Sequence, residues 1–105
     1  MANLKKSDLK LIKNFVAYPR GRGFVLDYSN VTFAELFKHE FGIDIDDKKF
    51  TEKGTSKGNR LLCFCEKGHD VLVATVLRRL FNEREVIKKT GLINQMMVWK
   101  ENLLI

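Results

Sequence analysis

Apolar residues recur three or four positions apart along most of this chain, and that spacing predicts amphipathic helices. The stretch near 24–28 is rich in β-branched and aromatic residues but is too short for more than a minor extended connector. The repeated spacing divides the chain into five helical segments, at about 4–17, 30–41, 55–66, 70–90 and 92–105. The pattern therefore predicts an all-α fold, a compact bundle of about five helices with at most a minor extended segment near 24–28.

Residues that end helices separate these segments. Pro19 follows the first segment, and a proline cannot continue a helix. Gly42, Gly68 and Gly91 follow the next three, and glycine is the common residue just beyond a helix end. The sequence also offers caps at the helix starts, namely Ser29, Asn30 or the Thr32–Glu35 pair for the second helix, Thr55 or Ser56 for the third, and Asp70 for the fourth.

The apolar sides of these helices predict one shared core. The second helix carries a phenylalanine-rich face, and the 70–90 segment carries the broadest apolar face of the chain. The residues expected at the centre of the core are Phe33, Phe37, Leu61, Phe64, Val73, Val76, Leu77 and Leu80.

Length and composition fit one domain over residues 1–105. The chain has 105 residues, 45% of them hydrophobic, which is enough for one modest core. It finishes on three aliphatic residues, which a free domain seldom exposes. We therefore expect an N-terminal fragment of a larger protein, whose last helix contacts the next domain or another copy through Met96, Trp99, Leu103 and Leu104.

No apolar run is long enough to span a bilayer and no signal sequence is visible, so we expect a cytoplasmic protein without a membrane partner.

The two cysteines do not indicate a redox or metal site. Cys63 and Cys65 have a C-x-C spacing, whereas C-x-x-C is typical of redox and zinc sites. His39 and His69 add no set with zinc-ligand spacing and pair with neither cysteine. We therefore expect buried, reduced thiols, no metal, no cofactor and no catalytic residue, so the chain is not expected to be an enzyme.

The segment 54–60 resembles a phosphate-binding loop only in composition. A Walker loop needs a lysine directly after its second glycine, but Lys57 precedes Gly58 here. The segment is better interpreted as a helix start. Lys57 and Arg60 add positive charge to a helix end that already attracts anions. The sequence favours an internal carboxylate as their partner over a ligand phosphate, with Asp44, Asp46 and Asp47 as the candidates.

Charge leaves a second function class open. The formal net charge is +6, which permits an acidic partner without requiring one. A nucleic-acid surface, resembling a helix-turn-helix, is the alternative to a protein-interaction module. Its candidate anion or nucleic-acid contacts are Arg20, Arg22, Lys53, Lys57 and Arg60.

Part of the chain resembles a known kind of module. The stretches "FVLDYSNVTFAELFKHEFGIDIDDKKF" and "GTSKGNRLLCF" resemble an N-terminal module of bacterial abortive-infection proteins, which act in antiphage defence. The rhythm of the helices is also similar to small death-like adaptor bundles. Both resemblances imply a non-catalytic adaptor that senses or assembles for an attached effector. They imply a protein partner or a downstream effector domain, and self-association is a further option.

Overall fold

The computed structural model describes the backbone of residues 4–103 and the side chains of residues 4–90. Within that part every regular element is helical, and the stretch 24–28 forms turns, not a strand. The all-α prediction is therefore confirmed. The elements are the four helices α1 (Lys6–Val16), α2 (Asn30–Leu36), α3 (Lys57–Lys67) and α4 (Asp70–Leu103), with a π-helical turn η1 (Phe37–Phe41) and a 3-10 turn η2 (Lys48–Phe50).

The described helices number four because the predicted fourth and fifth segments are one helix. α4 runs through Gly91 without a break and has 34 residues. A glycine inside a helix costs only about 1 kcal/mol relative to alanine. It ends a helix where the chain turns into the left-handed conformation, as at Gly42, whose φ is 66°. The predicted helix end at Gly91 is therefore wrong.

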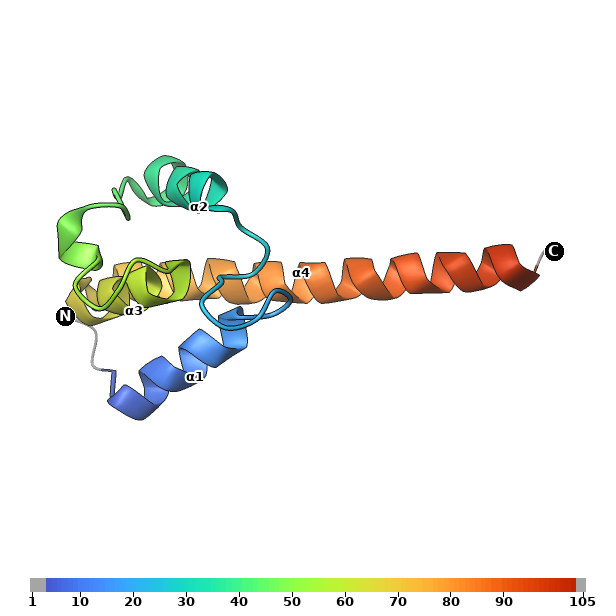
Figure 1. The fold of residues 1–105 in the computed structure, drawn as a ribbon, viewed down its shortest axis with the longest axis horizontal. Helices are drawn as coiled ribbons and strands as arrows, with labels where there is room; N and C mark the ends of the chain where they lie inside the picture. The colour runs from blue at the N-terminus through green and yellow to red at the C-terminus, as the bar shows by residue number, and fades with distance from the viewer. Residues whose placement is uncertain (1–3, 104–105) are drawn as a thin grey trace.

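The first half of α4 forms part of a compact bundle with α1, α2 and α3 (Figure 1). α1 contacts both α3 and α4, and α2 lies on the opposite side of α3 from α1 (Figure 1). The rest of α4 projects away from the other helices (Figure 1). This projection accounts for the elongated shape, with principal extents of 56 × 27 × 23 Å.

One continuous core joins all four helices. Phenylalanine rings form its centre, with ring centroids 5.0 Å apart for Phe33 and Phe37 and 5.5 Å apart for Phe37 and Phe64. All predicted core residues are buried except Leu77, which is partly buried. Leu77 lies at the edge of the α4 face whose centre is formed by Val76 and Leu80, because successive helical residues are 100° apart. The prediction of Leu77 as a central core residue is therefore wrong.

Two arginines attach α4 to the rest of the bundle. Arg84 Nε donates to the Phe15 carbonyl oxygen at 3.0 Å, and its guanidinium lies 4.0 Å from the centroid of the Phe15 ring. Arg79 Nε lies 3.1 Å from a carboxylate oxygen of Glu40 in η1. These contacts hold the end of α1 and the end of η1 against successive turns of α4.

Serine side chains cap two of the helices. Ser29 Oγ accepts a hydrogen bond from the Thr32 amide at 3.1 Å, so Ser29 is the cap among the alternatives for α2. Ser56 Oγ accepts from the Asn59 amide at 3.1 Å and caps α3. Asp70 is the first residue of α4 instead of the residue before it, so the prediction of Asp70 as the preceding cap is wrong by one position.

Candidate functional site

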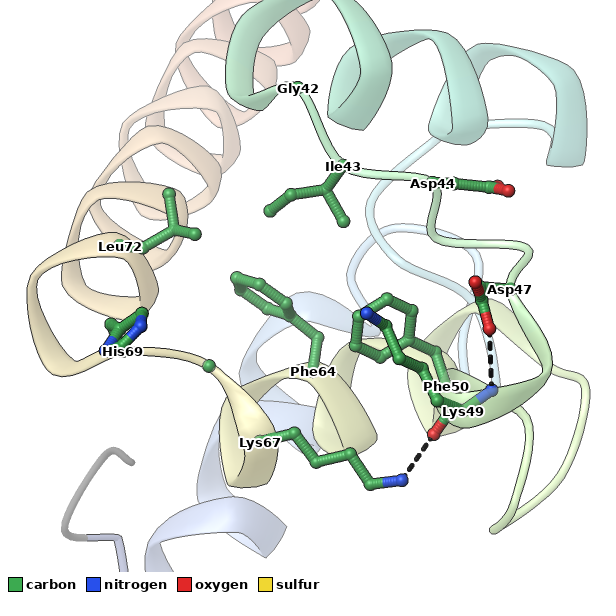
Figure 2. Close-up of a pocket in the computed structure, with 11 residues that line it drawn as sticks. Gly42, Ile43, Asp44, Asp47, Lys49, Phe50, Phe64, Lys67, His69 and Leu72 are labelled. Carbon is green, nitrogen blue, oxygen red and sulfur yellow. Dashed lines mark hydrogen bonds between the residues drawn. The ribbon is translucent and has the colours of Figure 1, made fainter.

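An open hollow of about 390 Å³ lies where the loop after η1 meets the junction of α3 and α4 (Figure 2). Its apolar lining is formed by Ile43, Phe50, Phe64 and Leu72. Charged or polar residues surround this lining, namely Asp44, Asp47, Lys49, Lys67 and His69. A volume of this order is within the range of small-ligand sites.

Two glycines, Gly42 and Gly68, are part of the backbone that borders the hollow. The left-handed Gly42 ends η1, and the next amide, of Ile43, bonds to the Phe37 carbonyl at 3.0 Å. Gly68 ends α3 at the sharp junction with α4. A Cβ atom at Gly68 would lie 2.9 Å from a methyl carbon of Val73, so a larger residue would force the two helices apart. The apolar floor therefore depends on the left-handed turn at Gly42 and on the close approach of Val73 at Gly68.

Several polar groups around the hollow have partners within the protein (Figure 2). Asp47 accepts a hydrogen bond from the Lys49 amide at 3.1 Å, and Lys67 Nζ donates to the Lys49 carbonyl at 2.7 Å. Lys67 also pairs with Glu52 at 2.8 Å, and the hydrogen bond to Glu52 raises the pKa of Lys67. These groups stabilise turns, so the hollow is suited to an apolar side chain or small apolar group.

The cysteines lie in the core and are not among the residues that line the hollow. Both are free and buried, as the sequence predicts. Cys63 Sγ donates to the Lys49 carbonyl at 3.1 Å. Burial and, to a smaller extent, the nearby Glu66 carboxylate together raise the pKa of Cys65 to about 12. The Cys65 thiol therefore stays protonated at neutral pH, whereas nucleophilic attack requires a thiolate.

Arg60, one of the five predicted anion contacts, has an internal partner. Its guanidinium forms an ion pair with Asp46 and donates to the Asn30 side-chain oxygen at 3.0 Å. It also lies 5.4 Å from the centroid of the Phe33 ring, and the residue is only 5% exposed. The interpretation of an internal carboxylate partner is confirmed for Arg60, and Asp46 is that carboxylate.

The other four predicted contacts lie in different surroundings. Lys53 forms an ion pair with Glu66. Arg20 and Lys57 lie near the same ring, that of Phe24, with their charged groups 5.8 and 4.7 Å from its centroid. Arg20 and Arg22 are exposed, whereas Lys57 is buried. The structure therefore brings Arg20 and Lys57 together and gives Lys53 a separate acidic partner.

The sequence does not indicate that Lys13, in α1, contacts the start of α3. Lys13 follows the helical pattern of an exposed lysine in α1, yet its Nζ donates to the Asn59 side-chain oxygen at 2.8 Å. The contact joins α1 to the first turn of α3 across 46 positions of sequence. Only the packing of the two helices shows that Lys13 lies beside the first turn of α3.

Three of the predicted protein-interface residues, Met96, Trp99 and Leu103, belong to the projecting part of α4. The helix backbone extends to Leu103. The side chains of Met96, Trp99 and Leu103, and the whole of Leu104, lie outside the described residues, so their role stays a prediction.

Comparisons with protein-family models, with curated proteins and with solved structures found no match to this chain. The resemblance to abortive-infection modules therefore stays a prediction. Among residues 4–103, no helix has both the length and the apolar character that crossing a membrane requires. Among the side chains of residues 4–90, no three histidine, cysteine, aspartate or glutamate residues are grouped so that they could hold a metal ion.

Proposed function

We propose that this chain is a non-catalytic protein-interaction module that associates through α4. The observation that carries the proposal is the projection of α4 beyond the bundle (Figure 1). Ile87 is the last described α4 residue that packs against the core. Residues 88–103 continue the helix for about 24 Å at 1.5 Å per residue.

A projecting helix of this length needs a partner for stability. Isolated helices shorter than about 12–15 residues are marginal in water, and somewhat longer ones gain most of their stability from packing an apolar face. The three residues directly after Ile87 are all exposed, namely Lys88, Lys89 and Thr90. The described contacts between α4 and the bundle core therefore end at Ile87. In this proposal, a second protein surface stabilises the part of the helix that follows.

The order of residues in α4 indicates where that surface lies. Leu92, Met96, Trp99 and Leu103 follow each other at intervals of four, three and four. In a regular helix these positions form one stripe, centred roughly 140° around the axis from the bundle-facing positions 73, 76 and 80. The stripe therefore occupies a different register position around the helix axis from the bundle-facing residues. A partner helix would bind there without displacing α1.

We assign that partner as a second copy of this chain. Alternating intervals of three and four are the heptad spacing by which identical helices pack together, knobs into holes. Two-fold pairing brings one stripe against the same stripe of its partner, which is the commonest symmetry of homo-oligomers. In this proposal α4 assembles two modules, each acting for an attached effector, as the resemblance to antiphage-defence adaptors implies.

The test is the molar mass in solution, measured by light scattering across a concentration series. We expect the wild type to form a dimer and the Met96→Glu/Leu103→Glu variant to be monomeric, because charge in the stripe prevents its burial. The Thr90→Glu/Asn94→Glu variant is the matched control. It changes the charge equally but at positions away from the stripe, so it should still dimerise. A wild type that stays monomeric at every concentration would refute the proposal.

Nucleic-acid binding is the second candidate function, and the exposure of both Arg20 and Arg22 in the segment between α1 and α2 favours it. Arg60 is unsuited to the test, because removing it would leave the internal Asp46 contact unpaired. Arg20→Ala/Arg22→Ala should instead lower the salt dependence of DNA or RNA binding by about one unit for each lost phosphate contact. Submicromolar binding at physiological salt that this variant loses would put nucleic acid first.

A further inference from the structure

α1 carries a second apolar face that the bundle leaves exposed. Three buried residues form its core-facing side, namely Leu9, Ile12 and Val16. Leu11 and Phe15 are four positions apart, so they are neighbours on another side of the helix. Their exposed fractions are 67% and 38%, and that of Tyr18, in the turn after α1, is 39%. Exposed apolar side chains that lie together mark interaction surfaces.

Arg84 places this face beside the point where α4 leaves the bundle. Its guanidinium lies 4.0 Å from the centroid of the Phe15 ring and 5.2 Å from that of Tyr18. Ile87, three positions later, is the last described α4 residue that packs against the core. The end of α1 and the loop after it therefore lie where the projection of α4 begins (Figure 1).

One side of α4 passes beneath α1 and continues as the stripe of the proposed dimer. The Phe81 and Phe15 rings are in contact, with centroids 4.7 Å apart. Positions 92 and 99 follow position 81 by 11 and 18 residues. At 100° per residue, the three positions lie within about 20° of one direction around the helix axis. α1 therefore covers one end of the α4 face whose other end is the stripe that begins at Leu92.

The location of α1 favours one direction for the partner helix. Packed helices lie about 8–10 Å apart. A parallel partner would bring its own bundle to the same end of α4, so the α1 helices of both copies would meet between the two long helices. An antiparallel partner brings only the end of its α4 toward α1. That end can pack against α1 without separating the long helices.

The exposed face of α1 also supplies contact area for a dimer. Stable interfaces bury about 800 Å² per partner, from roughly 20–30 residues on each side. The α4 stripe alone provides four apolar positions, at 92, 96, 99 and 103. Leu11, Phe15 and Tyr18 add three, and aromatic side chains such as the last two contribute large areas to interfaces. An interface that includes α1 is therefore closer to the size that a stable dimer needs.

We propose that a second copy of this chain binds antiparallel to α4 and packs the C-terminal part of its own α4 against Leu11, Phe15 and Tyr18. The two-fold axis passes near Leu92, which places position 100 of the partner copy level with Arg84, eight residues on either side of the axis. By symmetry each copy provides one α1 surface and one α4 end. This inference rests on the proposed association, and it adds the direction of pairing and a second contact surface.

The contact is tested by Leu11→Glu, with light scattering across a concentration series. Leu11 is exposed in the single chain, so the variant should keep the wild-type thermal midpoint. Its dimer dissociation constant should rise about tenfold or more, because dimerisation would bury the new charge. Val31→Glu is the matched control, since Val31 is equally exposed, at 67%, but belongs to α2. This variant should dimerise as the wild type does.

The direction is tested by mixing a Tyr18→Cys variant with a Lys100→Cys variant and adding a short thiol crosslinker. Both native cysteines are buried, so the introduced thiols should react first. The antiparallel dimer should give a crosslink between the two variants. Lys100→Cys alone should give none, because the two copies of position 100 are then about 24 Å apart along the helices. A parallel dimer gives the opposite pattern.

These measurements separate failure of this inference from failure of the association. A wild type that stays monomeric at every concentration would refute both. A dimer that Met96→Glu/Leu103→Glu abolishes, but that Leu11→Glu leaves unchanged, would overturn the α1 contact alone. Crosslinking of Lys100→Cys to itself, without crosslinking to Tyr18→Cys, would overturn the antiparallel direction.

Discussion

At the scale of single residues, neighbouring positions of α4 differ in what surrounds them. Leu80 is fully buried, whereas Leu77, three positions earlier, is only partly buried and packs at the edge of the core. Both follow the same apolar pattern in the sequence. Their contributions to stability should therefore differ, because the cost of truncation depends on the cavity that remains.

We predict that Leu80→Ala lowers the free energy of unfolding by roughly 2–5 kcal/mol, the usual cost of deleting a fully buried leucine side chain. Leu77→Ala should cost clearly less, because solvent already reaches part of that side chain. Urea denaturation of both variants measures the difference. Equal costs would show that the two positions are equally buried in solution.

Burial also determines the acid–base behaviour of Cys65. Its folded pKa of about 12 lies above the ordinary value of 9.0. Between these values the unfolded thiol loses its proton while the folded thiol keeps it, so the folded state binds more protons. The free energy of unfolding should therefore fall as pH rises above 9, by at most about 1.4 kcal/mol per pH unit from this group.

The measurement is urea denaturation of the wild type and of Cys65→Ala between pH 8 and pH 11, at the same salt concentration. The variant lacks this thiol, so its stability should decline less steeply above pH 9. The comparison of slopes removes the contribution of other groups that titrate in this range. Parallel slopes would contradict the raised pKa of Cys65.

At the scale of elements, the start of α3 depends on one of two adjacent hydroxyl residues. Ser56 accepts the hydrogen bond from the Asn59 amide, whereas Thr55 is exposed and precedes the cap. The same first turn also contains Asn59, whose side-chain oxygen accepts the hydrogen bond from Lys13 Nζ of α1. The cap therefore contributes both to helix stability and to the position of the turn that α1 contacts.

We predict that Ser56→Ala lowers the free energy of unfolding by about 1 kcal/mol, the typical cost of losing a serine cap. Thr55→Ala is the matched control and should change stability little. Thermal and urea denaturation of the two variants distinguish them. A larger loss from Thr55→Ala would identify Thr55 as the cap instead.

At the scale of the whole molecule, the continuity of α4 determines the shape. The radius of gyration over Cα atoms is 16.0 Å. A fully compact protein of this length would have a radius of about 13 Å. The difference comes from the part of α4 that extends past the bundle (Figure 1).

We predict that small-angle scattering of a monomeric sample will give a radius close to that of the extended form. The Met96→Glu/Leu103→Glu variant provides such a sample if the wild type dimerises. A helix that broke at Gly91 and folded back on the bundle would give a smaller radius, near that of a compact protein. Such a result would restore the five-helix arrangement expected from the sequence.

The sequence by itself determined the features that depend on neighbouring positions. Helix locations follow from apolar residues three and four apart, and the helix ends follow from Pro19, Gly42 and Gly68. The core residues of α2 and α3 were also predictable, because an amphipathic helix buries its apolar face. The cap of α3 and the buried thiols belong to the same class, since each depends on residue type and local pattern.

Only the tertiary structure decided the features that depend on residues distant in sequence. Val25, Leu26 and Ile45 are fully buried although they lie in irregular segments with no periodic signal. The hollow arises where the loop after η1 approaches α4. The choice of Asp46 for Arg60 likewise required the fold, because Asp47 is nearer in sequence and Asp44 lies in the same segment.

The contact between Lys13 and Asn59 and the projection of α4 were beyond the sequence for the same physical reason. Lys13 reaches Asn59 only when α1 packs against α3. Gly91 can end a helix or lie within one at modest cost, so local preference does not choose between these outcomes. Local patterns specify which face of a helix is apolar, and packing decides which surface covers it.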